Sequence, residues 1–232
     1  MATIPGGAYI TDTHSGEVIN GTGFGDDIFL HFAHDKVFSG DGNDLIVSTG
    51  GHAEIHAGSG QDIIFTYDGH NFVDGGADSD IITVGGQGNV VYGGSGDDVI
   101  YGGKGGDVLL GGSGNDAIHA GSGKEFLSGG DGNDVLYAGH GNDTMIGGAG
   151  DNMFVFGSGG GKNVVVDFHD GDSLLIAKNI NGLHVTTPQD ILAHVTDDNG
   201  NAVITLGHET ITLLNIKAED IHNNPAGYFH VQ

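Results

Sequence analysis

The sequence predicts an all-β fold, a parallel β-solenoid of about seven 18-residue turns followed by a small β-rich cap that contains a short helix. Three observations predict it. A nine-residue motif recurs in register through the middle of the chain, 47 of the 232 residues are glycine, and Asp and Glu together number 31 against 6 Lys and Arg. Glycine is frequent in collagen too, but the chain has only 3 Pro and no strict Gly-X-Y repeat, which excludes collagen.

The composition also limits the partners. A net charge of −25 repels phosphate backbones and anionic membranes, which argues against nucleic acid as a partner. The chain has no Cys, which excludes disulfides and thiolate metal sites. No stretch approaches the roughly 18 apolar residues of a membrane span, and Met1–Asp12 lacks the Lys or Arg of an N-terminal secretory signal. A chain this acidic and glycine-rich is expected to fold only if something bound neutralises its carboxylates.

Residues 1–29 are predicted to form an N-terminal cap with a degenerate first repeat. Gly21–Phe29 (GTGFGDDIF) has the composition of the motif but looks out of register with it. Its expected role is to cover the open sheet edges of the first turn, which solenoids need for solubility. Asp26 or Asp27 adds a candidate ligand at the nearest turn.

Residues 30–155 divide into fourteen nine-residue units without gaps, such as GGSGDDVIY from Gly93. A period of nine fits neither a helix nor a long strand, but it fits a strand of about three residues followed by a glycine-rich turn. Two units make one 18-residue turn, so stacked turns form two parallel sheets back to back. The eighth position is apolar in every unit and is the predicted core: Val37, Ile46, Ile55, Ile64, Val73, Ile82, Val91, Ile100, Leu109, Ile118, Leu127, Leu136, Met145 and Phe154.

The motif resembles that of a known family. Units such as Gly129–Tyr137 (GGDGNDVLY) match GGxGxDxUx, the nonapeptide of the RTX (repeats-in-toxin) proteins, and the match is specific because it recurs in register. The resemblance implies a parallel β-roll solenoid that binds Ca²⁺ in its turns. It also implies export by type I secretion machinery that recognises a C-terminal signal, and therefore a secreted protein located outside the cell or at its surface.

The sixth position of alternate units places a column of acids along one edge of the solenoid. Stacked carboxylates repel one another unless cations lie between them, and Ca²⁺ takes six to eight oxygen ligands. An aspartate that serves only as a turn former need not keep an 18-residue column. Asp78, in place of a motif glycine, weakens the prediction for its two neighbouring sites. The predicted Ca²⁺ ligands of this edge are Asp44, Asp62, Asp80, Asp98, Asp116, Asp134 and, at a weaker last site, Asn152.

The opposite edge has a different column: Asp35, Ala53, Asn71, Asn89, Asp107, Glu125 and Asp143. Only the last three are consecutive carboxylates, so two weaker Ca²⁺ sites are expected there and none near the start, for a total of about five to eight ions. Beside this column, His34, His52 and His70 recur one turn apart. They are a candidate site for a transition metal such as Zn²⁺, or a pH-sensitive seam. The alternative is that they are exposed turn residues whose rings stack.

Residues 156–232 lack the nine-residue period and are predicted to form the C-terminal cap. Strands are expected at 162–168 and 174–177, a short helix after Thr187-Pro188, and a hairpin of 202–206 with 209–215. The stretch Asp167–Asp172 (DFHDGD) is similar to the segment that follows β-rolls in secreted RTX proteins. By that resemblance, about the last fifty residues carry the export signal.

No catalytic motif is found. His208-Glu209 lacks the second His of H-E-x-x-H, no G-x-S-x-G elbow occurs, and Gly157–Lys162 departs from a phosphate loop at both ends. The sequence therefore predicts a secreted Ca²⁺-binding protein that is not an enzyme and that folds on binding Ca²⁺ outside the cell. The alternative is a carbohydrate-binding or adhesive module, similar to the repeat modules of secreted alginate epimerases, with an extracellular polysaccharide or surface as partner. Catalysis at an unrecognised site ranks third.

Overall fold

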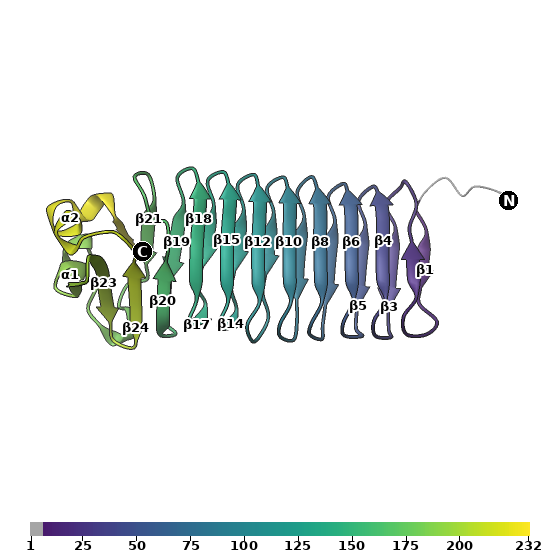
Figure 1. Ribbon diagram of the computed structural model, residues 1–232, viewed down its shortest axis with the longest axis horizontal. Helices are drawn as coiled ribbons and strands as arrows, with labels where there is room; N and C mark the ends of the chain where they lie inside the picture. Colours follow the sequence, from purple (N-terminus) through teal and green to yellow (C-terminus); the bar gives the residue numbers. More distant parts are fainter. Residues whose placement is uncertain (1–6) are drawn as a thin grey trace.

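The computed structural model describes residues 7–232, which wind into a long solenoid with two sheets back to back (Figure 1). From β1 to β21 successive strands alternate between these sheets, except that β14 Ser122–Gly123 and β17 His140–Gly141 pair with each other in a short third sheet. The first sheet contains, in spatial order, β1 Tyr9–Thr11, β3 Asp27–Leu30, β5 Leu45–Ser48, β7 Ile63–Thr66, β9 Ile81–Val84, β11 Val99–Tyr101, β13 Ala117–His119, β16 Val135–Tyr137, β19 Met153–Phe156, β21 Ser173–Ile176 and β25 Phe229–Val231. The second contains β2 Val18–Asn20, β4 Lys36–Asp41, β6 Glu54–Ser59, β8 Phe72–Ala77, β10 Val90–Ser95, β12 Val108–Ser113, β15 Phe126–Asp131, β18 Thr144–Ala149, β20 Gly161–Val165, β24 Glu209–Leu213, β23 Asn201–Leu206 and β22 Val195–Asp198.

The register confirms the predicted 18-residue turn. Val91 pairs with Leu109 in the second sheet, and Ile100 pairs with Ile118 in the first, both in parallel. The predicted core is also confirmed, because all fourteen eighth-position side chains are fully buried between the sheets. Each turn therefore buries about two apolar side chains in this ladder, and the core is only one layer thick.

The strands of the two sheets differ in length, which the sequence did not predict. Those of the first sheet have three or four residues along the repeats, whereas β4 to β18 of the second sheet have six and run on through the glycines. Gly94 shows why glycine is needed there. Its φ is 120°, and a Cβ would lie 2.0 Å from the carbonyl oxygen of Gly76 in the preceding turn. Close backbone approach at this position therefore extends the pairing.

Within the described residues the solenoid has nine turns, from β1–β2 to β19–β20, rather than about seven. The prediction that Gly21–Phe29 lies out of register is wrong, because Asp27 pairs with Leu45 and Ile28 with Ile46, 18 residues on. After Val155 the winding continues with a 20-residue step, as in the pair Met153 and Ser173. Residues 1–6 of the predicted N-terminal cap lie outside the described residues.

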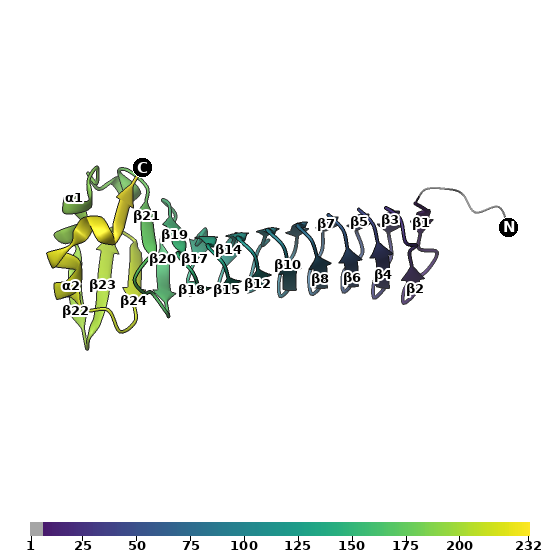
Figure 2. The same ribbon diagram turned by 90° about the horizontal axis from the view of Figure 1, so that it is seen from above.

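The C-terminal cap closes the solenoid at the end opposite β1 (Figure 2). β23 and β24 form the predicted antiparallel hairpin, and β24 also pairs in parallel with β20 of the last turn. The predicted short helix is α1 Pro188–Leu192, where the Asp190 carboxylate accepts the N–H of Thr187 at 2.9 Å. A second helix, α2 Ala218–Asn223, was not predicted. Among residues 7–232, no helix has the length and apolarity needed to cross a membrane.

Candidate calcium centres

One edge of the solenoid carries a continuous column of buried polar residues, all aspartates except Asn152, and is here called the aspartate edge. The turns that form it lie at the top of Figure 1. In each turn one carboxylate oxygen accepts the backbone N–H of the column residue one turn earlier. Asp98 Oδ1, for example, lies 2.8 Å from the nitrogen of Asp80. The column is longer than predicted and comprises Asp26, Asp44, Asp62, Asp80, Asp98, Asp116, Asp134, Asn152 and Asp172, all at most 3% exposed.

The hydrogen-bonding of the second carboxylate oxygen differs between the middle of this column and its two ends. At the ends it has a protein donor: Asp26 Oδ2 accepts the N–H of Thr22 at 2.6 Å, and Asp172 Oδ2 accepts that of His169 at 2.9 Å. In between, a buried oxygen without a hydrogen-bond partner among residues 7–232 recurs once per turn, in Asp44, Asp62, Asp80, Asp98, Asp116 and Asp134. Buried polar atoms are normally paired, so these six oxygens are candidate ligands for a cation.

Four of the six unpartnered oxygens, those of Asp80, Asp98, Asp116 and Asp134, lie against the first glycine of their own units. A Cβ on Gly93 would stand 2.4 Å from Asp98 Oδ2, so the motif glycine leaves this space open. Burial, with a smaller contribution from neighbouring carboxylates, raises the pKa of Asp62, Asp80 and Asp116 to about 7. Burial likewise raises the pKa of Asp98 to about 6. Carboxylate and turn carbonyl oxygens are hard donors that fit Ca²⁺, and a cation here would favour the ionised form of each aspartate.

The other edge, here called the mixed edge, satisfies much of its column without an ion. Asn89 Oδ1 accepts the N–H of Asn71 at 2.9 Å, while its amide nitrogen donates to the carbonyl of Gly85 at 3.1 Å. Asp107, a predicted Ca²⁺ ligand, accepts the N–H of Asn89 at 2.7 Å on one oxygen and that of Gly103 at 3.3 Å on the other. These turns are therefore closed by protein hydrogen bonds.

Glu125 and Asp143 differ from the rest of the mixed edge. Within the described part of the chain, both oxygens of Glu125 and the Oδ2 of Asp143 are buried without a partner. Burial, together with the nearby Asp143 carboxylate, raises the pKa of Glu125 to about 9. The gap between these two residues is thus the strongest candidate site among those predicted on this edge. Asp35 and Glu209 also carry unpartnered buried oxygens within the described residues, and neither was predicted as a ligand because no consecutive acid in the column points to it.

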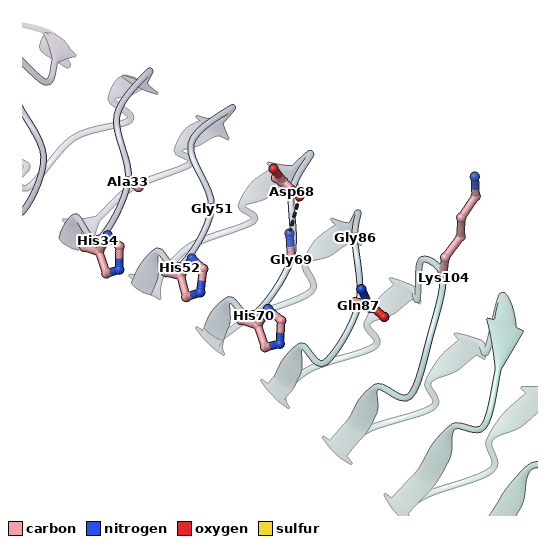
Figure 3. A pocket seen from close by; sticks show the side chains of 10 residues that line it. All are labelled: Ala33, His34, Gly51, His52, Asp68, Gly69, His70, Gly86, Gln87 and Lys104. Carbon is pink, nitrogen blue, oxygen red and sulfur yellow. Dashed lines mark hydrogen bonds between the residues drawn. The ribbon is translucent and has the colours of Figure 1, made fainter.

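The three histidines form a stack along the mixed edge (Figure 3). The ring centroids of His34 and His52 are 4.8 Å apart and those of His52 and His70 are 5.2 Å apart, each pair within 9° of parallel. Imidazole lone pairs lie in the ring plane, so parallel stacked rings do not direct them at one ion. No cluster of three His, Asp or Glu side chains in residues 7–232 has a metal-holding arrangement. The stacking alternative fits this geometry, and the zinc hypothesis gains no support from it.

The comparison with protein families agrees with this site. The family model of the RTX calcium-binding nonapeptide repeat matches residues 47–82, 83–118 and 119–154. Among solved structures, the chain is similar to the extracellular lipase LipA from Serratia marcescens, with 17% identity, a TM-score of 0.30 and coverage of 72% of this chain and 39% of the lipase. The chain thus spans well under half of that protein. A search of curated proteins found no match. Residues 47–154 are therefore RTX calcium-binding nonapeptide repeats, and they form a β-roll.

Proposed function

We propose that this chain is a secreted calcium-binding β-roll that folds when it binds Ca²⁺ outside the cell. The observation that supports the proposal most is the row of six buried, unpartnered aspartate oxygens along the aspartate edge. An unpaired buried carboxylate is costly, and six in one column at successive turns strongly disfavour the folded chain unless cations bind between them.

The thin core also supports the proposal that folding depends on a bound cation. Ordering a chain costs about 1–2 kcal/mol per residue for the backbone alone, and glycine loses more freedom than any other residue. With one layer of core side chains per sheet, apolar burial offsets less of this cost than in a domain with a thick core. Cation binding therefore supplies part of the folding free energy, as it does in small metal-dependent domains.

The expected affinity connects folding to location. Sites built from few carboxylates and many carbonyls are expected in the extracellular range, with Kd of about 10⁻⁴–10⁻³ M. In the proposal the chain stays unfolded at intracellular Ca²⁺ concentrations, leaves through type I secretion machinery that recognises its C-terminal region, and folds outside. The proposal assigns the chain no catalytic role.

Circular dichroism during a Ca²⁺ titration tests the proposal. The full chain in excess chelator should show little β-structure, which rises cooperatively as free Ca²⁺ reaches the millimolar range. A parallel Mg²⁺ titration is the control, because Mg²⁺ dehydrates reluctantly and demands a smaller octahedral site. A complete β-spectrum in chelator, or an equal response to Mg²⁺, would contradict the proposal. Export is tested separately, by measuring secreted chain with and without a co-expressed type I exporter.

A further inference from the structure

A buried carboxylate lies outside the repeats, where the cap meets the roll. Glu209 is the first residue of β24, and it pairs with Gly161 of β20, the last second-sheet strand of the solenoid. Glu209 is only 1% exposed to solvent. Glu209 therefore places a carboxylate from the cap at the end of the mixed edge, in contact with the final turn.

Hydrogen bonds continue the mixed-edge column into the cap through this residue. The Asn163 amide nitrogen donates to Glu209 Oε1 at 2.8 Å, and Asn163 Oδ1 accepts the backbone N–H of Asp143 at 2.8 Å. The backbone of Gly160 and the side-chain amide of Asn181 also act to lower the pKa of Glu209, but burial outweighs them and raises it. The Asn181 amide nitrogen donates to the carbonyl of Leu206 at 2.8 Å.

Two oxygens in this arrangement remain without a donor. Glu209 Oε2 and Asp143 Oδ2 are both buried and have no hydrogen-bond partner in the described part of the chain. None of the ion pairs formed by residues 7–232 includes either side chain. At the corresponding end of the aspartate edge, Asp172 Oδ2 accepts the N–H of His169. The mixed edge ends instead on a carboxylate with an open oxygen.

We propose that a divalent cation of the Ca²⁺ class binds between Asp143 and Glu209 and holds the C-terminal cap to the roll. The inference rests on the proposed function, since it extends calcium binding beyond the repeats. The two unpartnered carboxylate oxygens supply the hard oxygen ligands that Ca²⁺ prefers. Because β24 covers the open edge of β20, losing the ion should loosen the cap before it affects the repeats.

Glu209→Gln tests this site with minimal change of shape. It removes the charge and keeps an oxygen that can accept from Asn163. Glu219→Gln is the matched control, because Glu219 is an exposed acid in the first turn of α2. Native mass spectrometry at saturating Ca²⁺ should count one ion fewer for Glu209→Gln and the wild-type number for the control. Hydrogen exchange in β23 and β24 should become about tenfold faster in Glu209→Gln alone.

The outcomes separate this inference from the proposed function. If Glu209→Gln binds as many ions as the wild type and protects its cap equally well, Glu209 is a neutral buried acid and the inference is overturned. If the wild-type chain binds no Ca²⁺, the proposed function itself fails. Glu209→Asp covers the case in which the Gln variant loses its cap altogether. Rising Ca²⁺ should restore cap protection in Glu209→Asp, and no restoration at any Ca²⁺ concentration would also overturn the inference.

Discussion

The two edges of the roll use the same backbone geometry but close their turns in different ways. At both edges a buried side-chain oxygen accepts the N–H of the residue one turn earlier, at 2.8 Å for Asp98 and 2.9 Å for Asn89. The other terminal atom makes the difference. In Asp98 it is an oxygen without a partner among the described residues, whereas in Asn89 it is an amide nitrogen that donates to the Gly85 carbonyl. Under the proposed function, the change from a carboxylate oxygen to an amide NH₂ group therefore decides whether a turn needs a cation.

The two edges of the roll are expected to depend on calcium to different extents. Among residues 7–232, one carboxylate oxygen of the aspartate edge has no donor in six consecutive turns, while the mixed edge from Asn71 to Asp107 is closed by amides and backbone N–H groups. An asparagine thus satisfies the hydrogen bonds of its turn by itself, whereas an aspartate at the same position would need a bound cation. Most of the calcium requirement of this chain should therefore come from one side of the roll.

The largest expected effect comes from converting the aspartate edge to the chemistry of the mixed edge. The triple variant Asp62→Asn, Asp98→Asn and Asp134→Asn removes one carboxylate from every gap between Asp44 and Asn152. It should lose most of its bound Ca²⁺ in native mass spectrometry. In chelator it should keep more β-structure than the wild type by circular dichroism, because asparagine can donate to its own turn, as the Asn152 amide does to the Gly150 carbonyl at 3.4 Å.

The matched control changes three exposed acids of the same edge, Asp97, Asp131 and Asp151, to Asn. It alters the net charge equally but leaves the buried column intact, so its ion count and calcium requirement should match the wild type. A wild-type ion count in the buried-column variant would show that the column does not bind the ions. Equal loss of structure with and without Ca²⁺ would show that asparagine cannot replace an aspartate and its ion at this edge.

The second prediction concerns pH in the absence of Ca²⁺. Burial raises the pKa of Asp62, Asp80 and Asp116 from 3.8 to about 7 in the folded chain. The folded state therefore binds protons that the unfolded state releases. Their contribution to stability is fully present below about pH 4 and is lost as the pH rises through about 7. In chelator, β-structure measured by circular dichroism should increase as the pH falls from about 7.5 to about 4.5.

With Ca²⁺ present the same protons compete with the ion. The Ca²⁺ concentration at the folding midpoint should therefore rise as the pH falls over the same range. The triple Asn variant should show a weaker pH response in chelator, since it has lost three of the raised carboxyls. An apo chain whose β-structure is independent of pH, or decreases on acidification, would contradict the assignment of these aspartates as buried acids.

The features of the fold and site that follow from the nine-residue repeat could be predicted from the sequence, and the features outside the repeat could not. The core ladder and the acid column follow from an 18-residue spacing, so Ile100 and Asp98 could be placed before the structure was known. The extra turns were not predicted. The N-terminal one keeps the 18-residue step, as Ile10 and Ile28 show, but its sequence lacks the glycine motif. The C-terminal one pairs across a 20-residue step, as Thr144 and Val164 show. Asp107 was predicted as a ligand from its charge. In the structure it accepts hydrogen bonds from the backbone N–H groups of Asn89 and Gly103 and from the Asn89 side-chain amide, which the sequence alone does not show. Glu209 could not be placed from the nine-residue period, because it lies on a hairpin strand of the cap and joins the column through its hydrogen bond with Asn163.

A smaller effect is expected from the asparagines of the mixed edge. Asn89→Ala removes the acceptor of the Asn71 N–H and the donor to the Gly85 carbonyl. Leaving these buried groups unpaired should cost about 1–3 kcal/mol of unfolding free energy, with no change in ion count. Denaturant unfolding in saturating Ca²⁺ measures the cost. Asn89→Asp sharpens the comparison, because it places a second carboxylate beside Asp107 and should add one bound Ca²⁺. A reduced ion count in Asn89→Ala would show that this part of the edge also holds calcium.

The smallest effect is expected at the histidine stack. His52 has a φ of 65°, a left-handed conformation that costs a residue with a Cβ about 1–2 kcal/mol. Stacking between aromatic rings offsets about 0.5–1.5 kcal/mol of this. Because the two contributions nearly cancel, His52→Gly should change the free energy of unfolding by less than about 1 kcal/mol. His52→Val keeps the strain and loses the stacking, so it should destabilise the chain by about 1–3 kcal/mol.

Thermal unfolding in saturating Ca²⁺, with and without added Zn²⁺, measures both variants. The wild type and His52→Gly should unfold at temperatures within a few degrees of each other, and Zn²⁺ should shift neither, because parallel rings 4.8 and 5.2 Å apart do not direct their nitrogens at one ion. If Zn²⁺ stabilised the wild type but not His52→Gly, the rings would have to turn out of their stack to bind it. The two edges would then differ in which metal they bind, and no longer in whether they need one.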